Sequence, residues 1–379
     1  MLLALASALL CCGGTPGPAA LTFSVTVPAD TPAASTVWLT GNQPELGSWN
    51  GHVVALAPGA DGKYVAKVVL AAGTALEFKF LLDDRWEVAA GGLDIVNRTY
   101  TVAQSAQLDL TVARWAAPGG CTPTTTGTIR RHAQVSPGAI PVKARDLIVY
   151  LPPGYDLNTS VRYPVLYMHD GQNLMDACTS FAASEWHADE TAEQLIGQGK
   201  VAPLIIVGVY NTSDRIPDYT PVPDPRYGGG NADAYGRFLV EVVKPLIDST
   251  YRTRPEAQYT GVAGSSLGGL VSMYFALTRY DTFTRFGVVS PSVWWAGRDI
   301  VARVNALASK PAVKIWEDIG TSEGDADALP DARTLRDSLL AKGWAQGTDF
   351  SYLEAAGAGH NEAAWSARFG QVLEFLYPP

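Results

Sequence analysis

The stretch Tyr259-Thr-Gly-Val-Ala-Gly-Ser-Ser-Leu-Gly-Gly269 predicts a strand, a sharp turn that carries Ser266, and the first turn of a helix. An apolar run suited to a buried strand precedes the turn, and apolar residues recur at helical spacing after Leu267. A serine in such a turn has a strained backbone, so the residues two positions before and after it must lack bulk. Gly264 and Gly268 meet that need, and we therefore predict that Ser266 is a nucleophile. An ordinary Gly/Ser-rich turn before a helix is the alternative.

A nucleophilic serine needs an oxyanion donor and a base. The first N–H groups of a helix have no intrahelical acceptor, which places the Leu267 N–H to bind a developing oxyanion. Of the five histidines, only His360 follows Ser266 in the chain. It lies in a loop of small residues between a predicted strand, 349–354, and a predicted terminal helix, 362–376. We expect His360 to be the base, and a solvated loop histidine is the alternative.

The acid that would orient His360 is sought at the end of another predicted strand, Val313 to Ile319. Glu323 is our choice because the turn after that strand would carry it past the sheet edge towards the histidine. Asp318 still lies within the strand, and Asp325 is held in reserve. Any of the three could instead be a solvated loop carboxylate.

Five separated motifs carry a family resemblance: Tyr167-Met-His-Asp-Gly-Gln-Asn-Leu174, Ser184-Glu-Trp-His-Ala-Asp-Glu190, Tyr251-Arg-Thr253, Gly264-Ser-Ser-Leu-Gly-Gly269 and Ser290-Pro-Ser-Val-Trp-Trp295. Together they resemble the esterase D family of α/β-hydrolases, which includes feruloyl and acetylxylan esterases of carbohydrate esterase family 1, siderophore esterases and mycolyltransferases. The resemblance covers roughly residues 129 to 379. It implies Ser266 as nucleophile, His360 as base and Glu323 as acid. It also implies a second oxyanion donor in the loop after Gly171, which we place at the Gln172 N–H.

Length and composition fit a protein of two domains. The chain has 379 residues, of which 47% are hydrophobic and 17% charged, so a sizeable core can form. The net charge of −9, without any Lys/Arg cluster, argues against a nucleic-acid partner. We expect no cofactor and no metal, because the histidines are few and scattered and no phosphate-binding or dinucleotide fingerprint follows a strand.

Residues 1–20 are interpreted as a leader rather than as part of the fold. Leu2 to Leu10 is an apolar run of signal-peptide length, too short to span a bilayer, and Cys11 and Cys12 follow it. We therefore expect a secreted or cell-envelope protein with a possible lipid anchor at one of these cysteines. No Lys or Arg precedes Lys63, which weakens the interpretation, and an unstructured tail is the alternative.

Residues 21–113 change character: short bursts of alternating or apolar residues alternate with Gly, Pro, Asn and Asp turns. This pattern predicts an all-β sandwich. Residues 114–128 are rich in Pro, Gly and Thr and predict a semi-extended, solvated linker. Cys121 in this linker could form a disulfide with Cys178 in an oxidising compartment.

Three stretches of the sandwich are distinctive: Gly41-Asn-Gln-Pro-Glu-Leu-Gly-Ser-Trp49, Ala72-Gly-Thr-Ala-Leu-Glu-Phe-Lys-Phe80, and Trp86-Glu87 followed by Asn97-Arg98. They resemble the starch-binding domains of carbohydrate-binding module family 20. The resemblance implies an α-glucan platform made by Trp49 and Trp86, with Lys79 and Asn97 as hydrogen-bonding residues. An indole can stack on the apolar face of a sugar ring, but both tryptophans could instead fill the core. Trp38, within a strand, is expected in the core.

From residue 129 onwards, strand and helix patterns alternate and predict an α/β-hydrolase domain with a mostly parallel, three-layer sheet. Ligands of such folds bind at the carboxyl ends of strands, where the predicted catalytic residues fall. The irregular stretch Asn211 to Gly230 predicts a binding wall or lid. Candidates to line an acyl or alcohol pocket are Arg215, Tyr219, Trp294 and Trp295.

These features predict a serine carboxylic-ester hydrolase that acts on acylated or feruloylated carbohydrate and carries an α-glucan-binding module. A siderophore-type esterase or an acyltransferase of the same fold is a second hypothesis. A non-catalytic surface protein that binds polysaccharide is a third.

Overall fold

The structure is a computed structural model that describes residues 17–49, 52–59, 62–83, 85–88, 97–116, 123–180 and 184–379. It divides into two compact units, Met1–Pro118 and Gly119–Pro379, and the division falls within the stretch predicted to be a linker. Cys11, Cys12 and Cys121 lie outside the described residues. Cys178 is disulfide-bonded.

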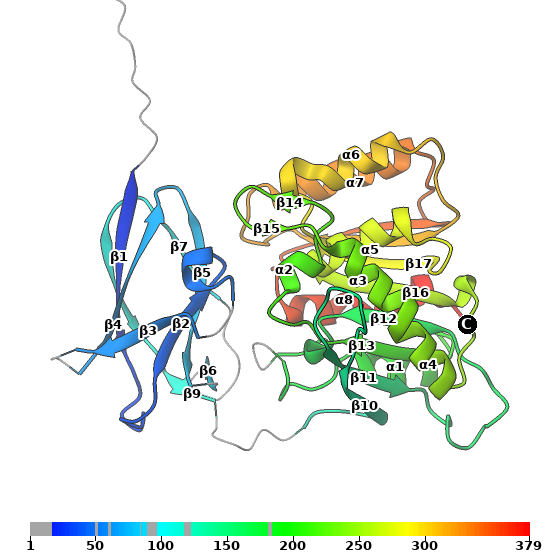
Figure 1. Ribbon diagram of the computed structural model, residues 1–379, viewed down its shortest axis with the longest axis horizontal. Coiled ribbons are helices and arrows are strands. Elements are labelled where there is room, and N and C mark those ends of the chain that lie inside the picture. Colours follow the sequence, from blue (N-terminus) through cyan, green and yellow to red (C-terminus); the bar gives the residue numbers. More distant parts are fainter. Residues whose placement is uncertain are drawn as a thin grey trace, which may run out of the picture. The chain divides into compact units, whose positions relative to one another are not determined.

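The N-terminal unit is built from β-strands (Figure 1). They are β1 (Pro18–Thr26), β2 (Val37–Gly41), β3 (Val54–Pro58), β4 (Tyr64–Ala71), β5 (Ala75–Leu82), β6 (Arg85–Val88), β7 (Arg98–Thr101), β8 (Ala106–Thr111) and β9 (Arg114–Trp115), with a 3₁₀ turn at Pro44–Leu46. The hydrogen-bonded order is β8-β1-β4-β3-β2-β5-β6-β9, and β7 also pairs with β5. Antiparallel pairing predominates, although β1 and β8 run parallel.

One apolar core holds this unit together. Inward side chains of β1 and β4 share a cluster with inward side chains of β2 and β5. Phe23 of β1 meets Phe78 of β5 edge to face, with ring centroids 5.2 Å apart. The path of strands therefore folds over so that its two halves cover a common core, which is consistent with the alternating burial along β4.

Two details of the N-terminal unit differ from the sequence predictions. The first strand begins at Pro18, within the stretch assigned to the leader. Arg114 and Trp115, assigned to the linker, form β9 instead, and Trp115 is buried with its indole N–H donating to Thr31 Oγ1 at 2.8 Å. The composition of 114–128 suggested a linker throughout, but cross-strand pairing with β6 places its first residues in the sheet.

The C-terminal unit contains one large sheet with the order β10-β11-β13-β12-β16-β17-β18-β19. Its strands are β10 (Thr128–Val135), β11 (Arg145–Leu151), β12 (Val165–His169), β13 (Ile205–Val209), β16 (Thr260–Ser266), β17 (Arg285–Pro291), β18 (Lys314–Gly320) and β19 (Phe350–Ala355). β10 and β11 are antiparallel to their neighbours, and the strands from β13 to β19 run parallel. The sequence did not predict β10, which is polar and half exposed as edge strands often are.

Helices connect these strands. They are α1 (Ala188–Gly197), α2 (Arg215–Asp218), α3 (Ala232–Phe238), α4 (Lys244–Thr250), α5 (Leu267–Thr278), α6 (Trp295–Ala306), α7 (Ala328–Ala341) and α8 (Glu362–Leu376). A π-helical turn, Leu239–Val243, joins α3 to α4, so the helix is continuous but locally widened. The stretch 211–230 holds α2 and a small ribbon of β14 (Pro223–Asp224) and β15 (Gly228–Gly229).

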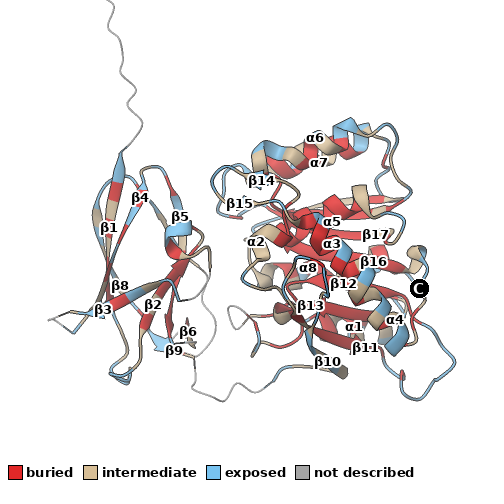
Figure 2. Cartoon of the chain, viewed as in Figure 1, coloured by how far each residue is buried: buried red, intermediate tan, exposed pale blue. Residues whose placement is uncertain are grey.

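Helices pack on both faces of the sheet. Val165 and Tyr167 of β12 belong to one apolar cluster, together with residues of α3, α5 and α6. Leu166 and Met168 of the same strand belong to a second cluster, with residues of α1 and α8. The central strands are consequently buried along their length (Figure 2). Within the described residues, no helix is both long and apolar enough to cross a membrane.

Candidate active site

Ser266 is the last residue of β16 and directly precedes α5. Its backbone has φ 58° and ψ −123°, a conformation that L-residues seldom adopt. A side chain at Gly264 would place its Cβ 2.9 Å from His169 Cδ2, and one at Gly269 would lie 2.7 Å from the Val289 carbonyl oxygen. The glycines therefore let α5 approach the sheet closely enough to form the turn.

His169 packs beneath this turn and is part of the scaffold. It is buried, and its Nδ1 lies 2.9 Å from the Tyr235 hydroxyl. Burial lowers the pKa of His169 to about 3, so the ring is neutral at physiological pH. His169 therefore contributes to packing and is not a candidate base for Ser266.

His360 and Glu323 lie together. His360 Nδ1 and Glu323 Oε2 are 2.6 Å apart. The other carboxylate oxygen, Oε1, accepts hydrogen bonds from the Gly320 N–H at 2.7 Å and the Ser290 hydroxyl at 2.5 Å. Burial raises the pKa of Glu323, but these hydrogen bonds and the charge of His360 outweigh it and leave the pKa below its ordinary value. An ionised Glu323 can thus hold the imidazole in one orientation.

The two other candidate acids have different surroundings. Asp318 lies within β18, where it accepts hydrogen bonds from the Arg368 guanidinium and the Trp316 indole, each at 2.7 Å. Asp325 accepts from the Asp327 backbone N–H at 3.0 Å and is exposed. Among the three carboxylates, Glu323 is the one bonded to His360.

Residues at the end of β17 connect Ser266 with the Glu323–His360 pair. Ser266 lies opposite Pro291 in the sheet, and its hydroxyl is 3.3 Å from that of Ser292. Ser290, two residues earlier, donates to Glu323 and accepts from the Trp365 indole N–H at 3.0 Å. The sequence alone did not indicate a role for either serine of this Ser-Pro-Ser motif.

The His360 loop is held by α8, which follows it. The Asn361 side chain caps this helix by accepting from the Ala364 N–H. The ring of Trp365, in the first turn of α8, meets the His360 ring edge to face, with centroids 5.0 Å apart. Ser266, Glu323 and His360 therefore all follow neighbouring parallel strands, at the carboxyl edge of the sheet.

The predicted oxyanion donors occupy two helix starts. Leu267 is the first residue of α5, and Gln172 lies in a 3₁₀ turn, Gly171–Asn173, directly after β12. N–H groups at such positions lack intrahelical acceptors. The Asn173 side chain donates to Glu362 Oε1 at 3.1 Å, so this turn also contacts the segment after His360.

An ion pair anchors the turn that carries Gln172. Asp170 has a left-handed backbone, with φ 56°, and accepts two hydrogen bonds from the Arg215 guanidinium at 2.8 Å each. Asn211 binds the same carboxylate at 2.7 Å, and its backbone N–H donates to the Gln172 side chain at 3.2 Å. Burial raises the pKa of Asp170, but Arg215 and Asn211 lower it further than burial raises it. The loop after β13 thereby fixes the loop after β12.

The predicted sugar-binding residues of the N-terminal unit lie mostly along one face of β5. Phe78 and Phe80 point into the core, so Lys79 between them lies on the opposite face. Trp86 is paired with Leu81 on that face, and Asn97 donates to Glu77 Oε2 at 3.0 Å. Lys79 is only 1% exposed.

Two further tryptophans lie in or near β2: Trp38 is within the strand, and Trp49 is in the loop that follows it. The backbone N–H of Trp49 donates to the Gly41 carbonyl at 2.7 Å, which holds its loop at the end of β2. Trp38 pairs with Leu81 and is half-buried outside the core cluster, so its prediction as a core residue is wrong. Its ring instead lies 4.9 Å from the ring of His52.

A family model described as putative esterase matches residues 140–376. The chain belongs to this esterase family. A second model, described as starch binding domain, matches residues 18–112. The esterase unit thus contains the Ser266 turn and the Glu323–His360 pair, and the starch-binding unit contains the face formed by β5.

Curated relatives resemble the two units separately. The uncharacterised protein YbbA of Bacillus subtilis is 26% identical over 62% of this chain and 92% of its own length. The ferri-bacillibactin esterase BesA of the same species is 30% identical over 39% of this chain and 54% of its own. An alpha-amylase of Niallia circulans is 44% identical over 27% of this chain but only 8% of its own.

Solved structures share the fold at low identity. The enterobactin esterase FES of Shigella flexneri has a TM-score of 0.55 and 15% identity, covering 90% of this chain and 87% of that one. A ferulic acid esterase has a TM-score of 0.52 and 19% identity, covering 66% and 98%. Siderophore and ferulic acid esterases are therefore structural neighbours of this esterase.

The residues predicted to line an acyl or alcohol pocket in the esterase fall into two groups. Tyr219 and Trp295 are 0% and 1% exposed, so they pack in the interior and do not line an open pocket. Arg215 is engaged by Asp170. Trp294 alone among the four is substantially exposed, at 37%, and its ring lies 5.6 Å from that of Tyr227.

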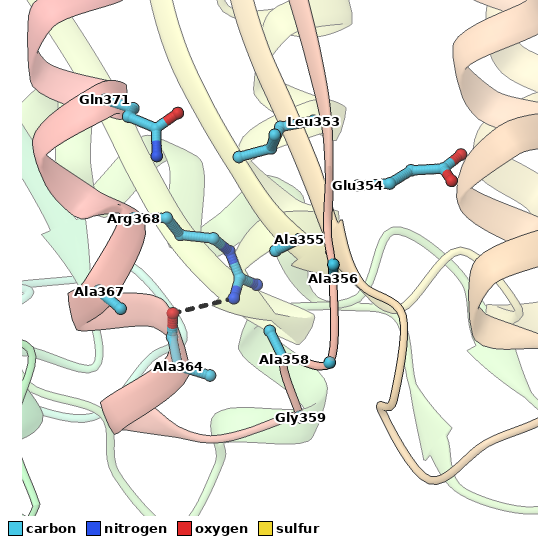
Figure 3. Close-up of a pocket in the computed structure, with 11 residues that line it drawn as sticks. Leu353, Glu354, Ala355, Ala356, Ala358, Gly359, Ala364, Ala367, Arg368 and Gln371 are labelled. Carbon is cyan, nitrogen blue, oxygen red and sulfur yellow. Dashed lines mark hydrogen bonds between the residues drawn. The ribbon is translucent and has the colours of Figure 1, made fainter.

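A pocket of about 540 Å³ lies beside the loop that precedes His360 (Figure 3). Its walls are the end of β19, the loop 355–359 and the side of α8 that carries Arg368 and Gln371. Glu354 points away from the pocket, where it binds Arg333. Neither Ser266 nor Glu323 lines this pocket, so we do not assign it to the ester substrate.

Proposed function

We propose that the protein is a serine carboxylic-ester hydrolase in which Ser266 is the nucleophile, His360 the base and Glu323 the orienting acid. The observation that carries this proposal is the 2.6 Å contact between His360 and Glu323, at the sheet edge where Ser266 occupies its strained turn. Such an arrangement of hydroxyl, imidazole and carboxylate supports acyl transfer in several unrelated folds. The fold we assign to this unit is the α/β-hydrolase, with helices on both faces of a mostly parallel sheet.

The proposed reaction proceeds through an acyl-enzyme. His360 takes the Ser266 proton as the oxygen attacks the ester carbonyl, and the oxyanion is bound by the Leu267 and Gln172 N–H groups. The tetrahedral intermediate then collapses, and His360 donates the proton to the departing alcohol. Water, deprotonated by the same imidazole, attacks the acyl-enzyme and releases the acid. Glu323 stays ionised throughout and stabilises the imidazolium.

The substrate we favour is an acylated or feruloylated carbohydrate. A starch-binding unit in the same chain would raise the local concentration of an ester attached to, or embedded in, α-glucan. Exposed Trp294, two residues beyond Ser292, and neighbouring Tyr227 offer an aromatic surface suited to a flat acyl group or a sugar ring. On the module, we propose that Trp49 and Trp86 stack on glucose and that Asn97 binds hydroxyl groups, whereas Lys79, at 1% exposed, is too buried to reach a sugar.

The likeness to BesA favours a second candidate, a siderophore-type esterase, and an acyltransferase would use a sugar hydroxyl in place of water. A panel of acetyl, feruloyl and longer-chain sugar esters, with a catechol siderophore ester alongside, distinguishes them by kcat/KM. Product transfer to added maltose would identify a transferase. We expect the feruloyl or acetyl sugar esters to give the highest kcat/KM, and a preference for the siderophore ester would contradict our choice.

Export to the cell envelope or medium is part of the proposal, with lipid attachment at Cys11 or Cys12 as one form of it. The apolar run Leu2 to Leu10 and the disulfide-bonded Cys178 support an oxidising destination. Fractionation of cells that express the full chain, with and without Cys11 and Cys12 replaced by Ser, tests both points.

The catalytic assignment is tested by covalent labelling. A fluorophosphonate reacts with an activated serine and not with an ordinary one, so we expect labelling of the wild type but not of Ser266→Ala or His360→Ala. Unlabelled wild-type protein, shown to be folded by circular dichroism, would instead support the third hypothesis, a non-catalytic polysaccharide-binding protein.

A further inference from the structure

Acidic side chains and one histidine gather at the start of α1, outside the proposed catalytic site. Glu185, His187 and Glu190 each offer one ligand atom, and these atoms all lie within 4.8 Å of one another. His187 Nδ1 is 3.5 Å from Glu185 Oε1 and 3.7 Å from Glu190 Oε2. Asp189, which directly precedes Glu190 in α1, is fully buried.

The carboxylates of this cluster are incompletely satisfied. Glu185 Oε2, Asp189 Oδ1 and Glu190 Oε2 are buried oxygens with no hydrogen-bond donor. The Glu185 side chain is 1% exposed. Within the part of the chain that the structure describes, no lysine or arginine forms a salt bridge with any of the three. Each of these unpaired oxygens loses its hydration on burial, and a bound cation would compensate for that loss.

The spacing of the cluster fits a small metal ion. Zinc binds imidazole nitrogen and carboxylate oxygen at about 2.1 Å with tetrahedral geometry, which places two ligand atoms about 3.4 Å apart. The two distances from His187 Nδ1 are close to that value. A calcium ion would prefer six to eight oxygen ligands, whereas a mixed set with an imidazole suits zinc and similar transition metals.

We propose that Glu185, His187 and Glu190 bind a divalent transition metal ion of the zinc type. The start of a helix carries roughly half a positive charge, which opposes a cation. The two ligand carboxylates carry two negative charges once the metal has displaced their protons, so the attraction exceeds that opposition. Counting histidines in the sequence could not reveal this site, because carboxylates supply two of the three ligands.

The site would also fix the start of the esterase unit. The Thr124 hydroxyl donates to Glu185, and the Thr126 N–H donates to Asp189 at 2.6 Å. The Thr126 hydroxyl reaches Glu190 Oε1 at 3.4 Å. A metal bound to the free side of the same carboxylates would hold them in place, so residues 123–126 would stay attached to α1.

The experiment uses tag-free, full-length protein that has been treated with a chelator and dialysed. Titration with Zn²⁺, followed by calorimetry, should show one saturable site with a raised unfolding temperature. We expect Glu185→Gln and His187→Ala each to weaken binding at least about 10-fold, since even the loss of a supporting partner costs a metal site that much. Glu193→Gln is the matched control: Glu193 lies on the same helix but binds the Tyr150 hydroxyl, and the amide oxygen can accept that bond.

His187 is well exposed, so His187→Ala should fold even if Glu185→Gln does not. Hydrogen exchange adds a local readout: amides of residues 123–128 should exchange more slowly when Zn²⁺ is added to the wild type, and this change should be absent in His187→Ala. Wild-type protein that binds no Zn²⁺ would overturn the proposal, because protons shared among the carboxyls would then satisfy the cluster. Equal Zn²⁺ affinity in His187→Ala and wild type would overturn it as well.

Discussion

The two units place their functional residues on different kinds of scaffold. In the esterase unit, Ser266, His360 and Glu323 lie in loops and turns at the carboxyl ends of parallel strands. In the starch-binding unit, Lys79 and Trp86 lie on the outward face of paired strands. A turn at a strand end exposes its side chain through backbone geometry, whereas a residue in a strand is exposed or buried according to which face it takes. A short sequence motif therefore predicts the exposed turn, whereas the exposure of a strand residue can be predicted only when the pairing of the strands is known.

The sharpest test of the esterase side compares neighbouring serines. Ser266→Ala should lower kcat by on the order of 10⁵-fold or more, because the nucleophile is lost and only binding and oxyanion stabilisation remain. Ser292→Ala, whose hydroxyl is 3.3 Å from that of Ser266, should stay within about tenfold of wild type. Hydrolysis of a short-chain aryl ester measures both. Comparable activity of Ser266→Ala and wild type would refute the assignment of the nucleophile.

A second comparison separates the candidate acids. Glu323→Gln should lower kcat by on the order of 10³- to 10⁴-fold, since an amide at that position can hold the wrong tautomer of His360. Asp325→Asn, at an exposed position two residues on, should have almost no effect. The same assay measures both variants. A larger loss of kcat in Asp325→Asn than in Glu323→Gln would show that the acid was misassigned. The loop that carries both residues would then have to rearrange to bring Asp325 to His360.

The outward face of the starch-binding unit should show a smaller effect. Trp86→Ala should weaken binding to amylose by roughly tenfold, because a stacked aromatic contact is worth about 1 to 1.5 kcal/mol. Tyr280→Ala, which alters an exposed aromatic residue of the esterase unit with no proposed role, should leave amylose binding unchanged. Amylose pull-down measures this, with thermal melting to confirm folding. Unchanged retention of Trp86→Ala would make Trp86 a structural residue.

The smallest expected effect concerns the pH dependence of stability. Because the pKa of Glu323 is lower in the folded protein than its ordinary value, the ionised carboxylate stabilises the fold at pH values above about 4.5. This contribution should be lost as the pH falls through the lowered pKa. Urea unfolding of wild type and Glu323→Gln from pH 7 down to 3 should show a difference that narrows only at the acid end. A difference that instead grows with acidity would contradict the direction of the shift.

The Ser266 turn and the Glu323–His360 contact of the proposed site could be predicted because they depend on short stretches of sequence. The Gly-x-Ser-x-Gly turn requires small residues at Gly264 and Gly268 for steric reasons, and the scarcity of histidines left His360 as the base. The choice of Glu323 depended on the turn after Gly320 carrying it past the strand end. In the structure, Glu323 also receives the Gly320 N–H, a contact within three residues of sequence.

Other features depended on contacts between distant segments. Tyr219 and Trp295 are aromatic, as pocket-lining residues often are, but in the structure they are buried by packing. Trp38 is a large apolar residue within a strand, which suggested a core position, but the register of β2 on β5 turns it outward. Arg215 is occupied by Asp170, a partner 45 residues earlier in the chain. Sequence periodicity does not predict whether such side chains are buried, exposed or paired. Their surroundings are formed by strands and helices that are distant in the sequence.

The sequence by itself determined the order of the two units, the strand and helix types, and the turn that presents Ser266, because each follows from side-chain size, backbone freedom or apolar spacing over a few residues. Only the tertiary structure decided which carboxylate meets His360, which tryptophans face outward, and that Glu185, His187 and Glu190 converge at α1. These outcomes depend on how strands and loops pack across many residues of sequence, and that packing is a property of the whole unit.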